Sequence, residues 1–246
     1  MKAILIGTYY QILNFLRVRK ALFFSFIFPI FLYGVFVFVW GNDSVTYTKF
    51  ICTGIVAITV ASNAMMAIGR IIVQYNRNGM VRILKTIPRG YITHLASLIL
   101  SRIFLITCAT IVLIAISYVI SHTIFSFTDL LLLEIGICIG VYVFTLLGQI
   151  IAEFLEDKHS EGSILNGIFY VIIFLSDCFY PITDMNPAFA MIVSINPMTP
   201  ILHIMRGEGN WFYVLITEII LLQLTTYIIS KKKSKKGNLC VLYLSL

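Results

Sequence analysis

Long apolar runs separated by short polar segments make up almost the whole chain. A transmembrane helix needs about 20 consecutive apolar residues, and six runs come close to that length. We therefore predict an all-α integral membrane protein with six transmembrane helices in a single domain at 1–230, followed by a basic tail at 231–246. The predicted spans are residues 21–40, 50–73, 95–120, 130–152, 162–180 and 211–230.

The composition excludes a soluble globular protein. Of the 246 residues, 59% are hydrophobic and 12% are charged, and the mean hydropathy is +0.96. A soluble domain has about 45–50% apolar and 25% charged residues, and a disordered chain is more polar still. A net charge of +7 is also found in nucleic-acid-binding proteins. Here the positions of the basic residues indicate membrane topology, so we expect the lipid bilayer and no nucleic acid as a partner.

Basic residues gather at 2–20, 70–89 and 231–236, whereas the loops at 41–49 and 121–129 contain Lys49 as their only Lys or Arg. Lys and Arg favour cytoplasmic loops. We therefore expect a multi-pass protein of the plasma (cell inner) membrane with both termini in the cytoplasm. Two cytoplasmic termini require an even number of spans.

Residues 3–18 have the spacing of an amphipathic helix. Apolar side chains recur every three or four positions, and small or polar residues occupy the opposite side. The apolar positions are Ile4, Leu5, Tyr9, Ile12, Leu13 and Leu16, and the opposite ones are Gly7, Gln11 and Asn14. The pattern predicts a helix lying in the inner membrane interface before the first span. A frayed N-terminus is the alternative.

The uncharged segment 185–205 is long enough to cross the membrane, but a crossing here would place the lysine-rich tail outside. It contains Pro187, Pro197 and Pro200, and prolines break helices. We predict a re-entrant hairpin on the outer side, between the fifth and sixth spans. Irregular backbone at membrane depth is tolerated only where protein or a water-filled cavity surrounds it, so the hairpin is a candidate for lining a path.

No catalytic or metal-binding motif is found. The chain has no Walker A loop, no nucleophile elbow and no zinc-protease motif. The histidines are dispersed, and the cysteines have no metal-ligand spacing, which is typical of small buried hydrophobes. These residues are His94, His122, His159 and His203, and Cys52, Cys108, Cys138, Cys178 and Cys240. We expect no disulfide, no metal site and no enzymatic activity in this chain.

The connector at 74–93 is the most informative predicted cytoplasmic segment. A short helix at 79–86 would place apolar residues on one face and Arg82 and Lys85 on the other, and Pro88 would end it. The apolar residues are Met80, Ile83, Leu84 and Ile87. Such a helix either docks on a partner or lies on anionic lipid, and the pattern alone leaves both open.

Two segments resemble motifs of the ATP-binding-cassette type 2 (ABC-2) export permeases. The first resembles the coupling segment E-R-E-x-G-T-L-E-x-L-x-x-T-P and matches it at Arg77, Gly79, Arg82, Ile83, Leu84, Thr86, Ile87 and Pro88. The second resembles L-S-G-x-x-F-P … P … N-P-L-T … R. It matches at Leu175, Ser176, Phe179, Tyr180, Pro181, Pro187, Asn196, Pro197, Met198, Thr199 and Arg206. With the helix arrangement, the resemblance covers nearly the whole chain.

The chain departs from these motifs at three positions. Asn76 and Asn78 stand where the family has acidic residues on either side of Arg77, and Asp177 stands where the family has glycine. If the acids help to grip the ATPase, this chain uses other groups.

The resemblance implies a permease that pairs with a separate cytosolic ATPase and with a second permease copy, identical or a paralogue. ATP and Mg²⁺ would be bound by the ATPase, and this chain would bind no cofactor. The implied ATPase-coupling residues are Arg77, Gly79, Met80, Arg82, Ile83, Leu84, Thr86 and Pro88. Glu153 and Glu156 of the acidic inner loop would be a second contact, with a solvated turn as the alternative. The candidate translocation-path residues in the second motif are Phe179, Pro181, Pro187, Asn196, Pro197 and Arg206, together with Asp177 at the position where the chain departs from the family.

Three acidic residues, Glu134, Asp177 and Glu218, lie in or beside apolar runs of the predicted outer half. Charges inside a membrane usually face a bundle interior or a cavity. They are therefore candidates for a cation-attracting vestibule or a substrate contact. Alternatively, they are tolerated near the head groups or hydrogen-bonded to Thr, Gln or Tyr.

The expected function is export of an amphipathic or hydrophobic substrate, such as a drug or an antimicrobial peptide. Multidrug resistance would be one consequence. Export of a lipid-linked glycan is an alternative within the same class. An ion-coupled secondary transporter, with one of the three acids carrying a proton, and a non-transporting membrane scaffold are alternatives from other classes.

Overall fold

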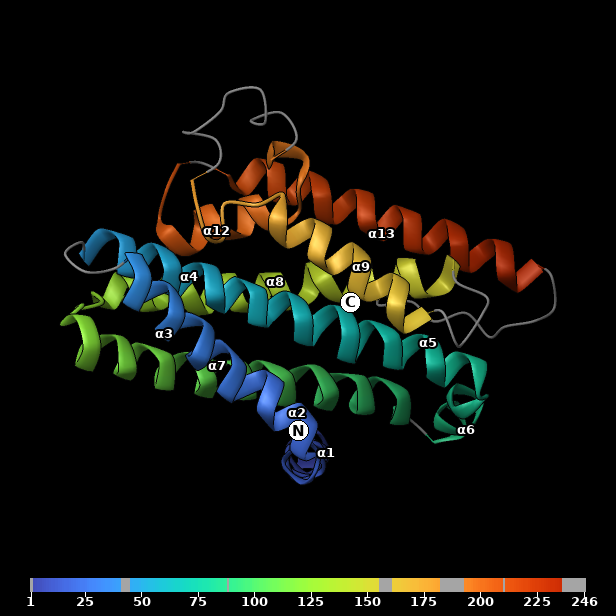
Figure 1. The fold of residues 1–246 in the computed structure, drawn as a ribbon. Coiled ribbons are helices and arrows are strands. Elements are labelled where there is room, and N and C mark those ends of the chain that lie inside the picture. The colour runs from blue at the N-terminus through green and yellow to red at the C-terminus, as the bar shows by residue number, and fades with distance from the viewer. Residues whose placement is uncertain are drawn as a thin grey trace.

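The computed structural model describes residues 2–40, 45–87, 89–154, 161–181, 193–209 and 211–235. The described part consists of helices and turns without a strand (Figure 1). Its helices are α1 (Lys2–Arg17), α2 (Arg19–Leu22), α3 (Phe28–Trp40), α4 (Val45–Ser62), α5 (Arg70–Arg77), α6 (Met80–Thr86), α7 (Gly90–Ser121), α8 (Phe127–Phe154), α9 (Glu161–Phe174), α12 (Met198–Arg206) and α13 (Phe212–Lys235). Two π-helical segments, η1 (Phe23–Ile27) and η2 (Asn63–Gly69), continue α2 into α3 and α4 into α5. The prediction of an all-α protein is confirmed for these residues.

Among the described residues, three helices are long and apolar enough to cross a membrane: Val45–Tyr75, Gly90–Ser121 and Phe127–Phe154. They contain 31, 32 and 28 residues, so each is about 42–48 Å long at 1.5 Å per residue. The hydrocarbon core is about 30 Å thick, and their ends therefore extend beyond it. Shorter apolar helices at Ser25–Val39, Gly162–Phe174 and Phe212–Ile228 lie within the other predicted spans. The number of crossings stays a prediction.

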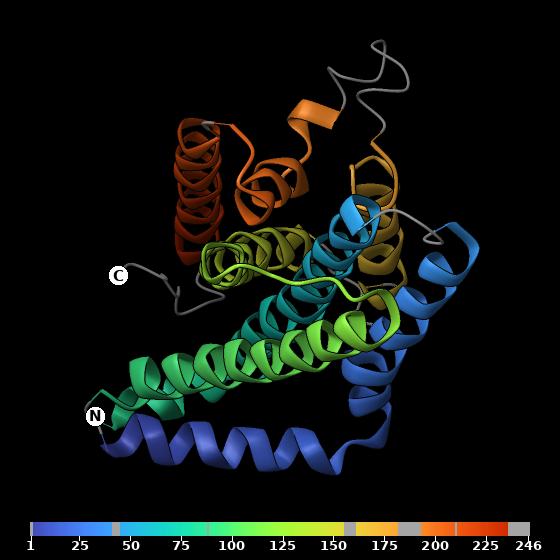
Figure 2. The same ribbon diagram turned by 90° about the vertical axis from the view of Figure 1, so that its left-hand side faces the viewer.

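The predicted amphipathic helix is present as α1, which packs along the first half of α7 (Figure 2). Ser97 Oγ donates a hydrogen bond to the Ile4 carbonyl at 3.2 Å, and Gly7 lies directly against Ser97. The guanidinium of Arg102 lies 4.4 Å from the centre of the Phe15 ring. Ile4, Gly7 and Phe15 of α1 thus contact α7, whereas other apolar side chains of α1, including Leu5, Tyr9 and Leu16, are exposed.

The first predicted span contains the π-helical segment η1, and the helix Val45–Tyr75 contains η2. Ser25 in η1 donates a hydrogen bond to Asn63 Oδ1 in η2 at 3.2 Å, and both side chains are buried. Asn63 Nδ2 donates in turn to the Thr59 carbonyl at 2.9 Å. π-Helical turns are rare and are frequent at functional sites. The bond therefore joins two neighbouring helices where both depart from α-helical geometry.

The centre of the bundle is a close contact between η2 and α8. A Cβ atom on Gly148 of α8 would lie 2.4 Å from the Met65 carbonyl oxygen, so only a glycine allows this approach. Glycines are common at helix interfaces in membranes because they let backbones touch. Met65, Ile68 and Phe144 are completely buried around this contact.

Several boundaries differ from the predicted ones, and at the starts of α4 and α8 and the end of α13 charged residues lie within the first or last turns of the helices. Lys49 and Asp129, expected in loops, lie in α4 and α8. They form an ion pair at 2.9 Å, which allows both helices to begin earlier than the apolar runs. The helix α9 ends at Phe174, short of the predicted residue 180, and α13 continues into the lysine-rich segment as far as Lys235.

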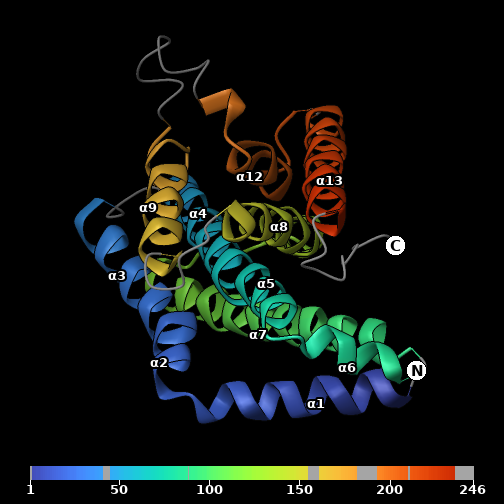
Figure 3. The same ribbon diagram turned by 90° about the vertical axis from the view of Figure 1, so that its right-hand side faces the viewer.

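The predicted re-entrant segment is only partly described, because residues 182–192 lie outside the described part. The rest contains a helical turn at 193–195 and the helix α12, which packs on α8, α4 and α13 (Figure 3). With nine residues, α12 is about 14 Å long and too short to cross a membrane. The re-entrant path itself stays a prediction.

Candidate functional site

The predicted short helix is confirmed as α6, at one end of the bundle (Figure 1). Gly79 precedes it with φ of +71°, a left-handed conformation that favours glycine. Ile87 follows it in an extended conformation, which is usual before a proline. These two residues set the length of α6.

The apolar side chains of α6 divide between the bundle and the exterior. Val81 is buried and fixes α6 to the bundle, a role that the sequence pattern did not indicate. Met80, Ile83 and Ile87 are 41%, 64% and 55% exposed, and Leu84 is half-buried. Thr86 donates a hydrogen bond to the carbonyl of Ile83 within α6. Pro88 and the side chains of Arg82 and Lys85 lie outside the described part.

Arg77 connects α5, just before α6, to the end of α8. Its Nη2 donates a hydrogen bond to the Ala152 carbonyl at 2.7 Å. Ala152 is among the last four residues of α8. The carbonyls of these residues lack partners within the helix and form the negative end of the helix dipole. Glu153 follows directly and is half-buried, whereas Glu156 lies outside the described part. This bond therefore ties the end of α5 to the end of α8.

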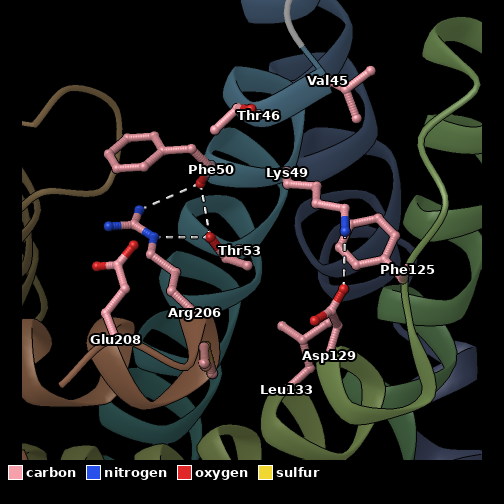
Figure 4. A pocket seen from close by; sticks show the side chains of 11 residues that line it. Val45, Thr46, Lys49, Phe50, Thr53, Phe125, Asp129, Leu133, Arg206 and Glu208 are labelled. Carbon is pink, nitrogen blue, oxygen red and sulfur yellow. Dashed lines mark hydrogen bonds and ion pairs between the residues drawn. The ribbon is translucent and has the colours of Figure 1, made fainter. Parts of the chain in front are cut away.

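At the other end of the bundle, Arg206 holds three elements together (Figure 4). Its Nε donates to Thr53 Oγ1 at 3.1 Å. Its Nη2 donates to the carbonyls of Phe50 at 3.3 Å and Asp177 at 2.7 Å. The guanidinium also lies 3.6 Å from the centre of the Phe50 ring. Arg206 thus ties the end of α12 to α4 and to the turn after α9.

The charge of Arg206 persists in this environment. Burial lowers the pKa of the Arg206 guanidinium from its ordinary value, but a guanidinium stays protonated at physiological pH. A planar fork that donates in several fixed directions suits this clamp better than an ammonium group.

Asn196 makes a second connection between the same elements. Its Nδ2 donates to the carbonyls of Ile172 at 2.7 Å and Leu175 at 2.9 Å, at the end of α9. Its Oδ1 accepts from the backbone N–H of Met198 at 3.0 Å, at the start of α12. Pro197 lies between them as the N-cap of α12. Asn196 therefore supplies partners for terminal backbone groups of two helices.

The turn after α9 packs tightly on α4 and α3. A Cβ atom on Gly54 would lie 2.0 Å from the Cys178 carbonyl oxygen. The Phe179 ring stacks on Phe36 with 4.6 Å between centroids. The Asp177 side chain is buried, Pro181 is half-buried, and Pro187 lies outside the described part. Asp177, Asn196, Pro197 and Arg206 are thus brought together, and the contacts that they make attach the turn after α9 and the helix α12 to the bundle.

The other two acidic candidates lie on separate helices. Glu134 of α8 accepts hydrogen bonds from Thr107 Oγ1 of α7 at 2.9 and 3.1 Å, which matches the hydrogen-bonded alternative. Glu218 of α13 has a buried Oε2 atom without a hydrogen-bond partner among the described residues. No contact found in the described part joins either of them to Arg206.

Within the described residues, no group of three or more His, Cys, Asp or Glu side chains could hold a metal ion. Cys52, Cys108, Cys138 and Cys178 are free thiols.

A comparison with protein-family models gives a match over residues 2–208 to the ABC-2 type transporter. The chain belongs to the ABC-2 type transporter family. The match contains α6 and ends just beyond Arg206, so both groups of residues described above are inside the ABC-2 region and α13 is outside it. A search of curated protein sequences found no match. Together with the apolar helices, the family makes this chain a multi-pass membrane protein and an ABC permease.

Proposed function

We propose that this ABC-2 chain is the permease subunit of an exporter that is driven by ATP hydrolysis in a separate cytosolic ATPase. The exposed apolar side chains of α6 carry this proposal. Burial of an aliphatic side chain contributes about 1.5–3 kcal/mol, so Met80, Ile83 and Ile87 give α6 a strong tendency to enter a cleft on a partner. ATP and Mg²⁺ belong to the ATPase in this scheme.

Movement of α6 has a continuous route into the bundle. The helix α5 leads from α6 to η2, and Arg77 ties α5 to Ala152 of α8. The segment η2 contacts α8 along its length and is bonded to η1 through Asn63 and Ser25. The clamp of Arg206 then links α4 to α12. Closure of an ATPase around α6 would thus reach the far end of the bundle.

The substrate and the assembly are also parts of the proposal. The basic residues gather at 2–20, 70–89 and 231–236 and are nearly absent from 41–49 and 121–129, which favours a membrane protein with both termini in the cytosol. We place it in the plasma membrane. Two copies of the permease, identical or paralogous, would enclose the path. Large apolar side chains are exposed along α3, α9 and α13, and an amphipathic or hydrophobic substrate such as a drug or an antimicrobial peptide fits such surroundings best.

The proposal is tested by isolating the tagged chain in mild detergent from cells that express it at its native level. We expect a cytosolic Walker-type ATPase in about one copy per permease, identified by mass spectrometry, and ATP hydrolysis in the eluate. A chain that elutes alone and without ATPase activity in several detergents would contradict the proposal.

A second candidate is an ion-coupled secondary transporter. The observation that favours it is the buried Oε2 atom of Glu218, which has no hydrogen-bond partner among the described residues. Ionisable groups within membrane helices often carry protons. In this case transport would depend on the proton gradient and not on ATP.

A further inference from the structure

A cavity of about 380 Å³ lies where α4 and α8 begin, at the opposite end of the bundle from α6. Its walls are the first turns of α4, the segment that leads into α8, and the end of α12 (Figure 4). Four charged residues line it: Lys49, Asp129, Arg206 and Glu208. Of these, only Arg206 belongs to the resemblance with the permease family.

The four charges lie on two sides of the cavity, with one cation and one carboxylate on each side. Lys49 Nζ lies 2.9 Å from Asp129 Oδ2 on one side. On the other side Glu208 lies beside the guanidinium of Arg206 (Figure 4), and Glu208 Oε2 lies 3.0 Å from Nδ1 of His203. Each cation also lies over an aromatic ring of the wall: Lys49 over Phe125 and Arg206 over Phe50. The lining therefore offers both signs of charge within one small volume.

Both cations keep donors for a further group. Lys49 has three N–H donors and Arg206 has five. Hydrogen bonds to described residues use one donor of Lys49, to Asp129. They use Nε and Nη2 of Arg206 but not Nη1. The side chains of Lys49 and Asp129 are each 35% exposed, so a ligand can reach this pair without the bundle opening.

We propose that this cavity binds a zwitterionic ligand with a phosphate and a primary ammonium group, as in the head group of phosphatidylethanolamine. The phosphate bonds to Lys49 and Arg206, and the ammonium bonds to Asp129 and Glu208. A purely anionic head group would face two carboxylates, and a purely cationic ligand would face two cations. A choline head group carries the same charges, but its quaternary ammonium has no N–H to donate.

The size and depth of the cavity agree with a head group. Its volume lies at the lower end of the range for small-molecule sites, about 300–1,000 Å³, which suits a head group better than a whole lipid or a peptide. Lys49 lies four residues into α4 and Asp129 two residues into α8. These helices are longer than the hydrocarbon core is thick, so their first turns lie at head-group depth.

The test compares three lipids that share the same acyl chains. The full-length chain is reconstituted with equal amounts of dioleoyl phosphatidylethanolamine, phosphatidylcholine and phosphatidylglycerol, purified again, and analysed by native mass spectrometry. We expect at least about tenfold enrichment of phosphatidylethanolamine, because a charge-assisted hydrogen bond is worth about 1.5–3 kcal/mol and each 1.4 kcal/mol is tenfold in affinity. Lys49→Ala and Glu208→Gln should each abolish most of this enrichment.

Two matched variants complete the test. Lys49→Arg keeps the charge and should keep the enrichment, and Arg17→Ala removes a charge at the end of α1, away from the cavity, and should also keep it. Soluble phosphoethanolamine that displaces the lipid at a similar concentration would assign the same chemistry to a soluble ligand. Equal occupancy by the three lipids, or an enrichment that survives both Lys49→Ala and Glu208→Gln, would overturn the proposal. The result does not depend on an ATPase partner.

Discussion

The hydroxyl of Ser25 donates to Asn63 Oδ1 at 3.2 Å, and this bond joins η1 to η2. The substitution Asn63→Leu removes the acceptor of the buried Ser25 hydroxyl. It also removes the hydrogen bond that Asn63 Nδ2 donates to the Thr59 carbonyl. A buried polar group that loses its partner costs about 1–3 kcal/mol. We expect the free energy of unfolding to fall by that amount, measured by thermal or denaturant unfolding in detergent.

The matched control for Asn63 is its neighbour. Ser62 donates only to the Thr59 carbonyl within its own helix, so Ser62→Ala should change the unfolding free energy by less than about 0.5 kcal/mol. Equal changes in the free energy of unfolding for the two substitutions would show that the hydrogen bond between the π-helical segments does not stabilise the protein.

Arg206→Lys should be strongly destabilising although it keeps the charge. An ammonium on a flexible stem cannot reproduce the planar fork that donates to Thr53, Phe50 and Asp177. We expect a loss of about 2–4 kcal/mol of unfolding free energy, since more than one hydrogen bond to a charged donor is lost. Arg17→Lys, at the exposed end of α1, should change nothing measurable. Similar melting temperatures of the Arg206→Lys variant and the parent would refute the clamp.

Replacement of glycine by alanine should lower the stability of the protein at Gly148 but not at Gly167. A Cβ on Gly148 would lie 2.4 Å from the Met65 carbonyl oxygen, whereas a Cβ on Gly167 would meet nothing within 4 Å. Gly148→Ala should cost about 1–3 kcal/mol through overpacking. Gly167→Ala should be neutral or stabilise α9 by up to about 1 kcal/mol, because alanine favours a helix. Unfolding of the two variants under identical conditions gives the comparison, and equal stabilities would disprove the close η2–α8 contact.

Ile83→Asp should uncouple the permease from its ATPase while leaving it folded, because the side chain is 64% exposed. We expect normal membrane insertion and loss of the co-purified ATPase. A matched control is Ile92→Asp, since Ile92 is 67% exposed on the neighbouring helix α7. Unchanged recovery of the ATPase with Ile83→Asp, or an equal loss with Ile92→Asp, would argue against docking through α6.

Glu218→Gln separates the two candidate functions. In an ATP-driven exporter the amide should be tolerated, and transport into vesicles should continue when an ionophore abolishes the proton gradient. In an ion-coupled carrier the same substitution removes the titrating group and should stop transport without changing assembly. The measurement is substrate flux with and without ATP and with and without the ionophore.

The sequence was sufficient for the parts of the fold that local chemistry determines. The apolar runs predicted the long helices, Gly79 and Pro88 predicted the limits of α6, and two short motifs indicated the family. Each of these signals comes from residues that are near one another in the chain, so no tertiary contact was needed to interpret them.

The sequence did not reveal the contacts between distant segments. Arg206 and Thr53 are 153 positions apart, and Lys49 and Asp129 are 80 apart. A single sequence contains nothing that pairs such residues. The π-helical segments have no distinct local composition, and Val81 has the same apolar character as its exposed neighbours. Which of them is buried is decided by packing against the rest of the bundle.

The packing of α1 on α7 imposes an order on biogenesis. Ser97 follows Ile4, its partner in α1, by 93 positions. At a synthesis rate of about 5–20 residues per second, it is made roughly 5–20 s later. During that interval α1 has no protein surface to pack on. Its exposed side chains Leu5, Tyr9 and Leu16 can be buried in the bilayer. The lipid therefore takes the place of a packing partner for α1 until α7 has been inserted.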